Sequence, residues 1–319
     1  MFLVPGTPPD TLAVELTLVR DSVGPVMAPL FDAVTQVAES LRPRRRAERT
    51  DTVRVHVRAR FLPSGLPAVG ASMRLISAPM LLSGGHGHFG FLNRPGGTFF
   101  NPGEDVDVPD AGVRGQVRLT LPASGDTVLV YRTSGISGRE QLAVQVTDGL
   151  QSQGQDRTVV VRWPGLVAMA RQGTQHEFKD QDPNIATQRH GNVNHWVEAG
   201  FRDRVLDAFR RYFEAVPEPR FPLPAPGGGT DTRFVVTEAS LEWGGLFDVA
   251  EVAPWRNPHR THRKGLDVDV RSTTMNAARQ EDFERACVGA RILCSREPNP
   301  SVPNNPPHYH LSPRQPRQQ

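Results

Sequence analysis

The sequence predicts a two-domain protein, in which an all-β sandwich precedes a smaller α+β domain built on an antiparallel sheet. Short runs of alternating apolar and polar residues, separated by turn residues, fill the first half. Near Pro164 this period-two pattern changes to a mixed periodicity that includes helical spacing. The chain has 319 residues, enough for two domains with separate cores. The predicted boundaries are 1–165 for the sandwich, 166–192 for a linker, 193–312 for the second domain and 313–319 for a disordered tail.

The composition is typical of a soluble globular protein, with 38% hydrophobic and 22% charged residues. No apolar run approaches the roughly 18–20 residues that span a bilayer, so no transmembrane segment is expected. The net charge of +3 comes almost wholly from arginine, because Lys179 and Lys264 are the only lysines. Neither a basic stripe nor a nucleic-acid-binding module is visible, so no nucleic-acid partner is expected. The first ten residues lack the basic and apolar regions of a signal peptide.

Short strands recur through the first domain, and turn clusters such as Pro63-Ser64-Gly65 separate them. The predicted strands lie at 11–19, 51–60, 72–77, 116–121, 127–132, 141–147 and 157–163. Several short strands with turn signals between them favour a β-sandwich. The stretch from Val130 to Gly138, followed by the strand at 141–147, resembles the last hairpin of bacterial immunoglobulin-like repeats. This resemblance implies an immunoglobulin-like domain.

Two segments of the first domain are less regular. Val26 to Leu41 spaces its apolar residues as an amphipathic helix does, and an arginine-rich run follows it. Residues 83–110 are rich in glycine and proline and are predicted to form a long loop. His86 and His88 alternate within this loop, but no acidic residue or third histidine accompanies them. A plain loop is therefore favoured over a metal site there.

The second domain mixes helical and strand patterns. A helical pattern opens at Asn194 and stops before Pro217, and a second helix is expected at 274–288. Phe234 to Val236 is predicted to be a buried strand, and the segment from Arg296 to Pro307 is an irregular approach rich in proline and asparagine.

The two cysteines, Cys287 and Cys294, are separated by seven residues. On a continuous helix this spacing puts them about 10 Å apart along the axis, which is too far for a disulfide. A disulfide would require the helix to break, for instance at Gly289. Both a disulfide and buried thiols remain open.

Two segments with strand alternation carry the residues of chemical interest. In the first, Asp267 and Asp269 alternate with apolar residues, so both carboxylates face away from a core. In the second, near the C-terminus, His308 and His310 share one face of a strand. Two neighbouring strands of this kind would bring a carboxylate and imidazoles together.

His262 completes the arrangement. It lies seven residues before Asp269, and Gly265 between them permits a tight bend from loop into strand. His262, Asp269 and His310 supply two imidazoles and one carboxylate, a three-ligand set that suits Zn²⁺. The fourth coordination position is left to water, which distinguishes a catalytic zinc site from a closed structural one.

The run from His262 to Asp269, followed by His308-Tyr-His310, resembles the zinc signature of the LAS metallopeptidases. This group includes the lysostaphin-type and D-Ala-D-Ala metallopeptidases and the metal-binding domain of hedgehog proteins. The sequence is most similar to the penicillin-insensitive murein endopeptidases, because His259 precedes His262 by three residues and Gly244-Gly245 lies upstream. The resemblance covers about the last third of the chain. It implies a zinc metallopeptidase that hydrolyses D-amino-acid-containing bonds of bacterial peptidoglycan, in the periplasm, at the cell surface or secreted.

The resemblance also implies roles for single residues. His308 would act as the general base or stabilise the tetrahedral intermediate. Pro307 stands where the D-Ala-D-Ala dipeptidases carry a catalytic glutamate, which favours the histidine-based branch. Asn305 stands where the murein endopeptidases carry another histidine, so their substrate preference is not transferred to this chain.

Four further residues are candidates for the surroundings of the site. Asp267 can orient His262 by hydrogen bonding or face solvent. His259 is either near the substrate or an exposed loop histidine. Glu238 and His195 are weaker candidates for the same cleft.

Two functions follow from these observations. The first is a zinc peptidase that acts on wall peptides, with the sandwich as a positioning or binding module. The second is a zinc-binding domain without turnover, as in hedgehog proteins, that serves recognition or adhesion at the cell surface. His308 favours the enzyme, because a pure binding domain needs no base beside the metal.

Overall fold

The computed structural model describes residues 10–19, 26–27, 51–80, 96–104, 111–178, 194–216, 223–224, 230–231, 233–245, 247–248, 258–259, 262–272, 275–297 and 307–314. The chain divides into two compact units, unit 1 (Met1–Arg162) and unit 2 (Trp163–Gln319). Each unit has its own hydrophobic core. Within the described ranges, no helix combines the length and the apolar character that crossing a membrane requires. The predicted loop histidines His86 and His88 lie outside the described residues.

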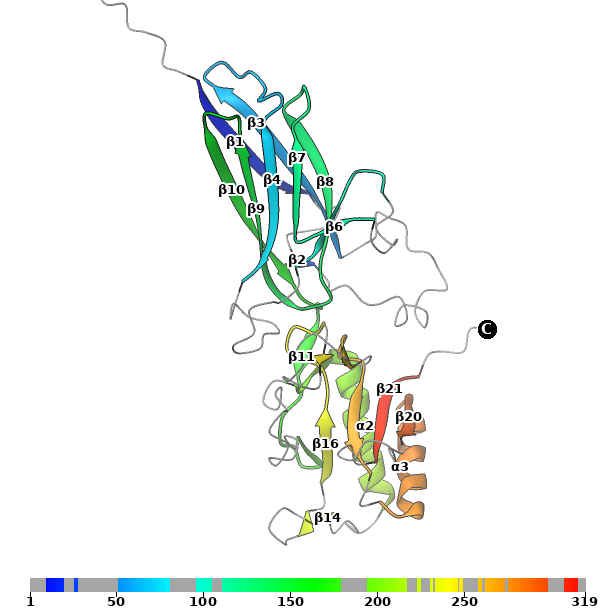
Figure 1. The fold of residues 1–319 in the computed structure, drawn as a ribbon. Helices are drawn as coiled ribbons and strands as arrows, with labels where there is room; N and C mark the ends of the chain where they lie inside the picture. The colour runs from blue at the N-terminus through cyan, green and yellow to red at the C-terminus, as the bar shows by residue number, and fades with distance from the viewer. Residues whose placement is uncertain are drawn as a thin grey trace, which may run out of the picture. The chain divides into compact units, whose positions relative to one another are not determined.

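Unit 1 is a β-sandwich of two five-stranded sheets, with the strand orders β1-β3-β8-β5-β6 and β2-β10-β9-β4-β7 (Figure 1). Alternate residues of both sheets point inward and share one core, as Leu16, Val55, Leu75 and Val144 do. The strands are β1 (Thr11–Val19), β2 (Val26–Met27), β3 (Thr52–Leu62), β4 (Ser72–Pro79), β5 (Thr98–Phe100), β6 (Val113–Arg114), β7 (Gln116–Thr120), β8 (Asp126–Arg132), β9 (Gly138–Thr147) and β10 (Ser152–Val161).

The strands predicted in unit 1 coincide with β1, β3, β4, β7, β8, β9 and β10 to within a few residues. The helix predicted from Val26 is wrong at its start, because Val26–Met27 forms β2 and pairs in parallel with β10. An edge strand offers unpaired backbone groups, and these two residues satisfy some of them. The remainder of that predicted helix lies outside the described residues.

Unit 2 is built on a five-stranded sheet of order β12-β16-β19-β21-β20, with helices α2 and α3 packed on one face (Figure 1). Its main elements are β11 (Leu166–Ala168), β12 (His176–Phe178), β13 (Trp196–Glu198), α2 (Ala199–Ala215), β16 (Phe234–Glu238), β19 (Val268–Arg271), α3 (Ala277–Gly289), β20 (Ile292–Glu297) and β21 (His308–Pro313). The short pairs are β14 (Leu223–Pro224) with β15 (Thr230–Asp231) and β17 (Phe247–Asp248) with β18 (Pro258–His259).

The linker predicted at 166–192 belongs to unit 2 as far as Phe178. Strand β11 pairs with β13, and β12 joins the five-stranded sheet in parallel with β16. The predicted antiparallel sheet is therefore antiparallel except at this pair. The sequence of β12 is polar, but Glu177 is buried and forms an ion pair with Arg233 at 2.7 Å. This partner, distant in sequence, makes a polar segment suitable for the sheet.

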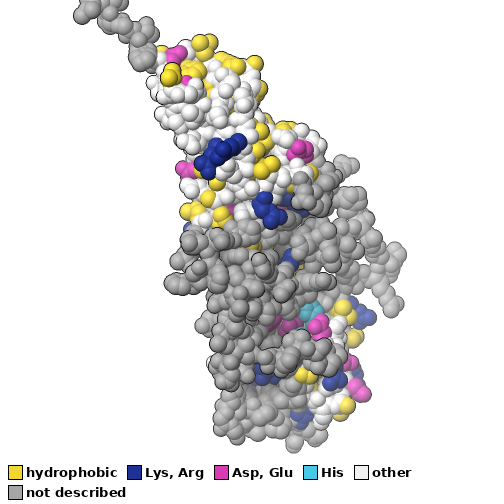
Figure 2. All heavy atoms as spheres, viewed as in Figure 1, with side chains coloured by type: hydrophobic (Ala, Val, Ile, Leu, Met, Phe, Trp, Pro, Cys, Tyr) yellow, Lys and Arg dark blue, Asp and Glu magenta, His cyan; other side chains and the backbone are white. Residues whose placement is uncertain are grey.

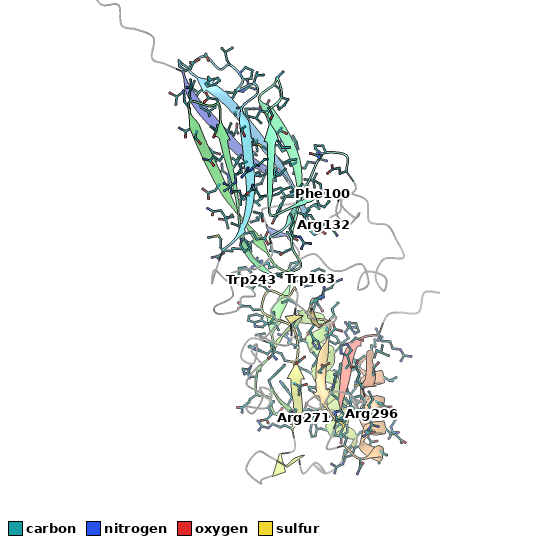
Figure 3. The ribbon with its side chains drawn as sticks, viewed as in Figure 1. Phe100, Arg132, Trp163, Trp243, Arg271 and Arg296 are labelled. Atoms are coloured by element: carbon teal, nitrogen blue, oxygen red, sulfur yellow. The ribbon has the colours of Figure 1, made fainter. Side chains whose placement is uncertain are left out.

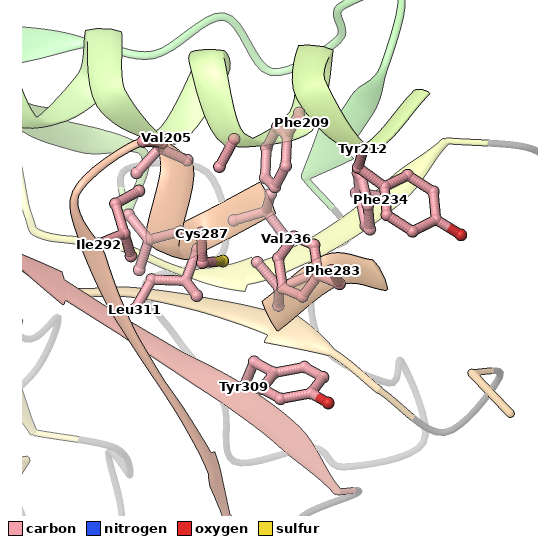
Figure 4. Packing of buried hydrophobic residues seen from close by; sticks show 14 of the residues in the cluster. Val205, Phe209, Tyr212, Phe234, Val236, Phe283, Cys287, Ile292, Tyr309 and Leu311 are labelled. Atoms are coloured by element: carbon pink, nitrogen blue, oxygen red, sulfur yellow. The ribbon is translucent and has the colours of Figure 1, made fainter. Parts of the chain in front are cut away.

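Helix α2 begins five residues later than the helical pattern does. The preceding residues form β13, and Glu198 caps the helix, its carboxylate accepting a hydrogen bond from the Phe201 backbone N–H at 2.7 Å. Inward-facing side chains of the two helices, including Phe209, Tyr212 and Phe283, pack against Phe234 and Val236 of the sheet (Figure 4). This core covers one face of the sheet.

The strand that follows α3 reaches two residues into the segment predicted to be an irregular approach, to Glu297, and residues 298–306 of that segment lie outside the described part of the chain. Helix α3 ends at Gly289, Arg291 adopts a positive φ of 60°, and β20 then runs antiparallel to β21. Cys287 lies in α3 and Cys294 in β20, and both are free thiols rather than a disulfide. Strand β21 continues to Pro313, one residue into the predicted tail, and residues 315–319 lie outside the described part of the chain.

Candidate metal centre

The sheet of unit 2 presents its site residues on the face that the helices do not cover. Val268 and Val270 of β19 are fully buried in the core with the helices, so Asp269 between them faces the opposite side. Asp269 is directly opposite His310 of β21 in the antiparallel register. Strand alternation therefore brings a carboxylate and an imidazole together, as the sequence predicts.

A short loop brings His262 over the same face. His262 itself has a positive φ of 63°, and Gly265 has a φ of 70°. A side chain at Gly265 would place its Cβ 2.4 Å from Leu166 Cδ2 and 2.6 Å from the Glu198 backbone nitrogen. The Glu198 N–H donates to the Gly265 carbonyl at 2.8 Å, so the loop is tightly packed against β13. Glycine is required at this position both for its φ and for its lack of a side chain.

The Gly244-Gly245 pair supports this loop from another side. The Gly245 N–H donates to the Arg263 carbonyl at 2.8 Å. A Cβ on Gly244 would lie 2.6 Å from the same carbonyl oxygen, and both glycines have positive φ angles of 65° and 81°. The Gly-Gly pair, one of the features on which the family resemblance rests, thus lies against the loop that carries His262.

His262, Asp269 and His310 form a compact cluster. His262 Nε2 lies 3.3 Å from Asp269 Oδ2, and His310 Nδ1 lies 2.9 Å from Asp269 Oδ1. Their three potential ligand atoms all lie within 4.8 Å of one another. Four donors about 2.0–2.2 Å from a tetrahedral zinc ion would be roughly 3.3–3.6 Å apart. The donor types and their spacing therefore fit a divalent metal ion.

Asp267 links two of these residues. Its Oδ1 lies 2.9 Å from His310 Nε2, and its Oδ2 accepts a hydrogen bond from the His262 backbone N–H at 3.1 Å. Because Nε2 of His310 is engaged by Asp267, Nδ1 is the nitrogen directed at the cluster. The expected partner of Asp267 was the His262 ring, but the structure shows the His262 backbone and the His310 ring instead. Such carboxylates commonly set the tautomer and orientation of a ligating histidine.

The charges within the cluster shift its pKa values strongly. Burial by itself lowers the pKa of His310, but hydrogen bonds to Asp267 and Asp269 outweigh it and raise this pKa to about 10. Burial also lowers the pKa of His262, but the nearby carboxylates, chiefly that of Asp269, together have the larger effect, so the pKa of His262 is raised. Burial opposes ionisation of Asp269, yet His262 and His310 hold its pKa well below the usual range. The carboxylates thus favour the protonated form of both imidazoles, and metal binding would have to displace those protons.

His308 lies beside the cluster but outside the set of three. Its Nε2 is 3.5 Å from Asp269 Oδ2 and 3.6 Å from Glu297 Oε2, both longer than a normal hydrogen bond. His308 is buried, whereas the side chain of Glu297 is 57% exposed.

Glu297 is a residue beside the site that the sequence analysis did not predict. The apolar run Ile292-Leu293-Cys294 was the signal that could have located its strand.

Of the other three residues predicted to surround the site, one lies at the cluster, one packs elsewhere in unit 2, and the side chain of the third is not described. Glu238 of β16 is buried opposite Asp269, and its charge contributes to the raised pKa of His262. The His195 ring packs against Phe178 and Trp196, ahead of α2. His259 belongs to β18, and its side chain lies outside the description. On the visible surface of unit 2, a histidine lies next to acidic side chains (Figure 2).

The fold and the cluster define a two-unit, mostly β protein with a candidate mononuclear metal centre. The sequence matches no protein-family model and no curated protein. Among solved structures, it is similar to the solution NMR structure of a conjugate transposon protein (residues 27–141) from Bacteroides vulgatus. That match has 13% sequence identity and a TM-score of 0.22, covering 50% of this chain and 90% of the other. A similarity at this level carries no argument about fold or function.

Proposed function

We propose that unit 2 is a zinc-dependent peptidase that hydrolyses peptide bonds of bacterial peptidoglycan, in particular bonds that involve D-amino acids. The observation that carries the proposal is the cluster of His262, Asp269 and His310, with His308 next to it but outside the set. The resemblance of these segments to the LAS metallopeptidases supplies the reaction and the substrate. Unit 1, as an immunoglobulin-like sandwich, would position the enzyme on the wall, outside the cytoplasm.

Zinc is the metal that this donor set favours. Two imidazoles and one carboxylate are typical of catalytic zinc sites, whereas Ca²⁺ and Mg²⁺ prefer oxygen ligands. The ion would be held by Nε2 of His262, Nδ1 of His310 and the carboxylate of Asp269. When bound, it supplies Lewis acidity and a water that is nucleophilic near neutral pH.

The side chains of the protein would perform the remaining steps. His308 would accept the proton of the attacking water and deliver it to the leaving amine, the usual task of a histidine base. Asp267 holds His310 in its ligating orientation through the 2.9 Å contact at Nε2. The buried surroundings of the cluster strengthen these electrostatic interactions, because water screens them little.

The test is incubation of the purified protein with muropeptides, with and without a chelator, followed by mass spectrometry. We expect cleavage products that disappear with the chelator and return when zinc is added. Zinc retained at one ion per chain without any cleavage would refute the peptidase and favour the non-catalytic, hedgehog-like recognition domain.

Two variants separate the base from the ligands. His308→Ala should keep its zinc and lose about 10²- to 10⁴-fold in turnover, the usual contribution of general acid–base catalysis. His310→Ala should lose zinc and activity together. If His308→Ala retains full activity, the base lies elsewhere, and Glu238 is the next residue to replace.

A further inference from the structure

Beside the cluster, the face of the sheet that the helices do not cover carries an arginine. Arg271 lies two residues after Asp269 in β19, so its side chain leaves the same face of the sheet. In the register of β19 and β21, Arg271 is directly opposite His308. Glu297 of β20 is opposite His308 on its other side. The three side chains therefore form one row across the sheet, next to the row of Asp269 and His310.

Arg271 differs from the other partly buried arginines of the protein. Arg233 pairs with Glu177 at 2.7 Å, and Arg132 pairs with Asp51 at 3.1 Å. Within the described part of the chain, by contrast, Arg271 forms no ion pair, and its Nε is buried without a hydrogen-bond partner. A buried donor of a charged group without an acceptor is costly, and native proteins rarely keep one without a reason.

We propose that Arg271 binds a carboxylate of the substrate, on the residue that adjoins the scissile bond. This inference rests on the proposed peptidase function and deepens it. Two residues along a strand span about 6.6 Å, and directly opposite residues lie about 4.5–5.5 Å apart. The backbone position of Arg271 is thus about 6.6 Å from that of Asp269 along the strand, a spacing that one extended dipeptide of a substrate also spans. The planar guanidinium group can donate two parallel hydrogen bonds to one carboxylate, whereas the ammonium group of a lysine cannot form such a bidentate pair.

The charges of the row limit the ligand to a single anionic group. Glu297 lies on the other side of His308, and its carboxylate is 3.6 Å from His308 Nε2. A polyanion that spread across the row would meet this negative charge. The substrate class is therefore a peptide with one free carboxylate next to the cleaved bond. That carboxylate is either the terminal α-carboxylate, as in a carboxypeptidase substrate, or an acidic side chain.

The test compares matched peptides that differ only in this carboxylate. The first pair is diacetyl-L-Lys-D-Ala-D-Ala and its C-terminal amide. The second is a C-terminally amidated peptide with an acidic residue after the bond, and its side-chain amide. The zinc-loaded protein should prefer the acid of at least one pair by about 10- to 100-fold in kcat/KM, the range expected for charge-assisted hydrogen bonds. The pair that shows the preference identifies the source of the carboxylate.

Variants assign the preference to the arginine. Arg271→Gln should abolish the preference for the acid while leaving the zinc content unchanged, and Arg271→Lys should retain part of the preference. The loss should appear mainly in KM, because carboxylate binding is shared by the ground and transition states. The matched control is Arg296→Gln, an exposed arginine of β20 that is opposite the core residue Tyr309 (Figure 3). This control should keep the full preference.

A binding measurement separates this inference from the peptidase proposal. Calorimetry of the zinc-loaded protein with N-acetyl-D-alanine, N-acetyl-D-alaninamide and the acid and amide of the second pair requires no turnover. If no peptide is cleaved, but the wild-type protein binds an acid more tightly than its amide and Arg271→Gln does not, the carboxylate site is supported and the peptidase function is refuted. Equal binding of acid and amide in both pairs by the wild-type protein, or an unchanged preference in Arg271→Gln, would overturn the inference.

Discussion

At the scale of single residues, Asp267 shows how one carboxylate organises two ligand-bearing segments. It contacts the ring of His310 from β21 and the backbone of His262 from the loop. Asp267 is not one of the three candidate metal ligands, yet it contacts two of the segments that carry them. The His262 backbone is held at a positive φ, which is unusual for a residue other than glycine and requires support from its surroundings.

Asp267→Ala should therefore weaken zinc binding by about 10- to 100-fold without unfolding unit 2, the usual effect of losing a carboxylate behind a ligating histidine. Asp267→Asn, which keeps one acceptor oxygen, should lose less. Competition with a chromogenic chelator measures the affinity. Asp203→Ala, at an exposed position of α2, is the control. Unchanged affinity in Asp267→Ala would show that the His310 orientation is set by other contacts.

Gly265 sets the conformation of the loop before β19. Two effects oppose a side chain there, the positive φ and the close approach of Leu166 and Glu198. Gly265→Ala should lower both the free energy of unfolding of unit 2 and the zinc content. Gly165→Ala is a matched control, because Gly165 also has a positive φ, of 80°, but has nothing within 4 Å of the added Cβ.

The two variants separate backbone strain from steric overlap. A non-glycine residue in the left-handed region costs about 1–2 kcal/mol, which Gly165→Ala should show alone. Gly265→Ala should cost more and should also release zinc. Urea unfolding and elemental analysis measure both quantities. Equal losses in the two variants would mean that the close packing at Gly265 relaxes easily.

At the scale of elements, Tyr131 connects the two sheets of unit 1. Its hydroxyl group contacts Ser77 of β4 at 2.7 Å, accepts from the Gly97 N–H at 3.0 Å and donates to Glu140 of β9. Tyr131 and Glu140 are completely buried. Burial, reinforced by the Glu140 carboxylate, raises the pKa of Tyr131 well above its usual value.

This shift predicts a loss of stability in alkali. Because the folded pKa lies above the unfolded value of about 10, the unfolded state binds fewer protons above that pH, and stability falls as pH rises further. The contribution is complete below about pH 10. The part of the tyrosinate absorbance that Tyr131→Phe removes should therefore appear only as unit 1 unfolds, because Tyr212 and Tyr309 belong to unit 2. Tyr131→Phe should also remove this part of the alkaline transition. Ionisation of Tyr131 in the folded protein near pH 10 would contradict the prediction.

At the scale of the whole molecule, the two cores are separate, and the candidate metal centre belongs to unit 2 alone. A ligand that binds only the folded state raises stability by mass action. A chelator should therefore lower the melting temperature of unit 2 and leave that of unit 1 unchanged. Differential scanning calorimetry with and without the chelator measures this. A shift of both transitions, or a single transition, would show that the units unfold together.

The sequence alone determined most strands of unit 1 and the residues of the candidate metal site, His262, Asp269 and His310. Alternation along a strand is a local property, because one buried face imposes a period of two on the residues that form it. The same alternation put Asp269 and His310 on a face away from the core. The spacing of His262, Gly265 and Asp269 is also local, and the structure has a tight bend at that glycine.

Only the tertiary structure decided the contacts between segments that lie far apart in the chain. Glu177 is buried in β12 because Arg233 neutralises it, so a polar stretch that the sequence assigned to a linker joined the sheet. Asp267 contacts the His310 ring 43 residues away, and the β19–β21 register alone placed Arg271 opposite His308. Burial and pairing of charges depend on the partner that the fold supplies, and no local pattern contains that partner.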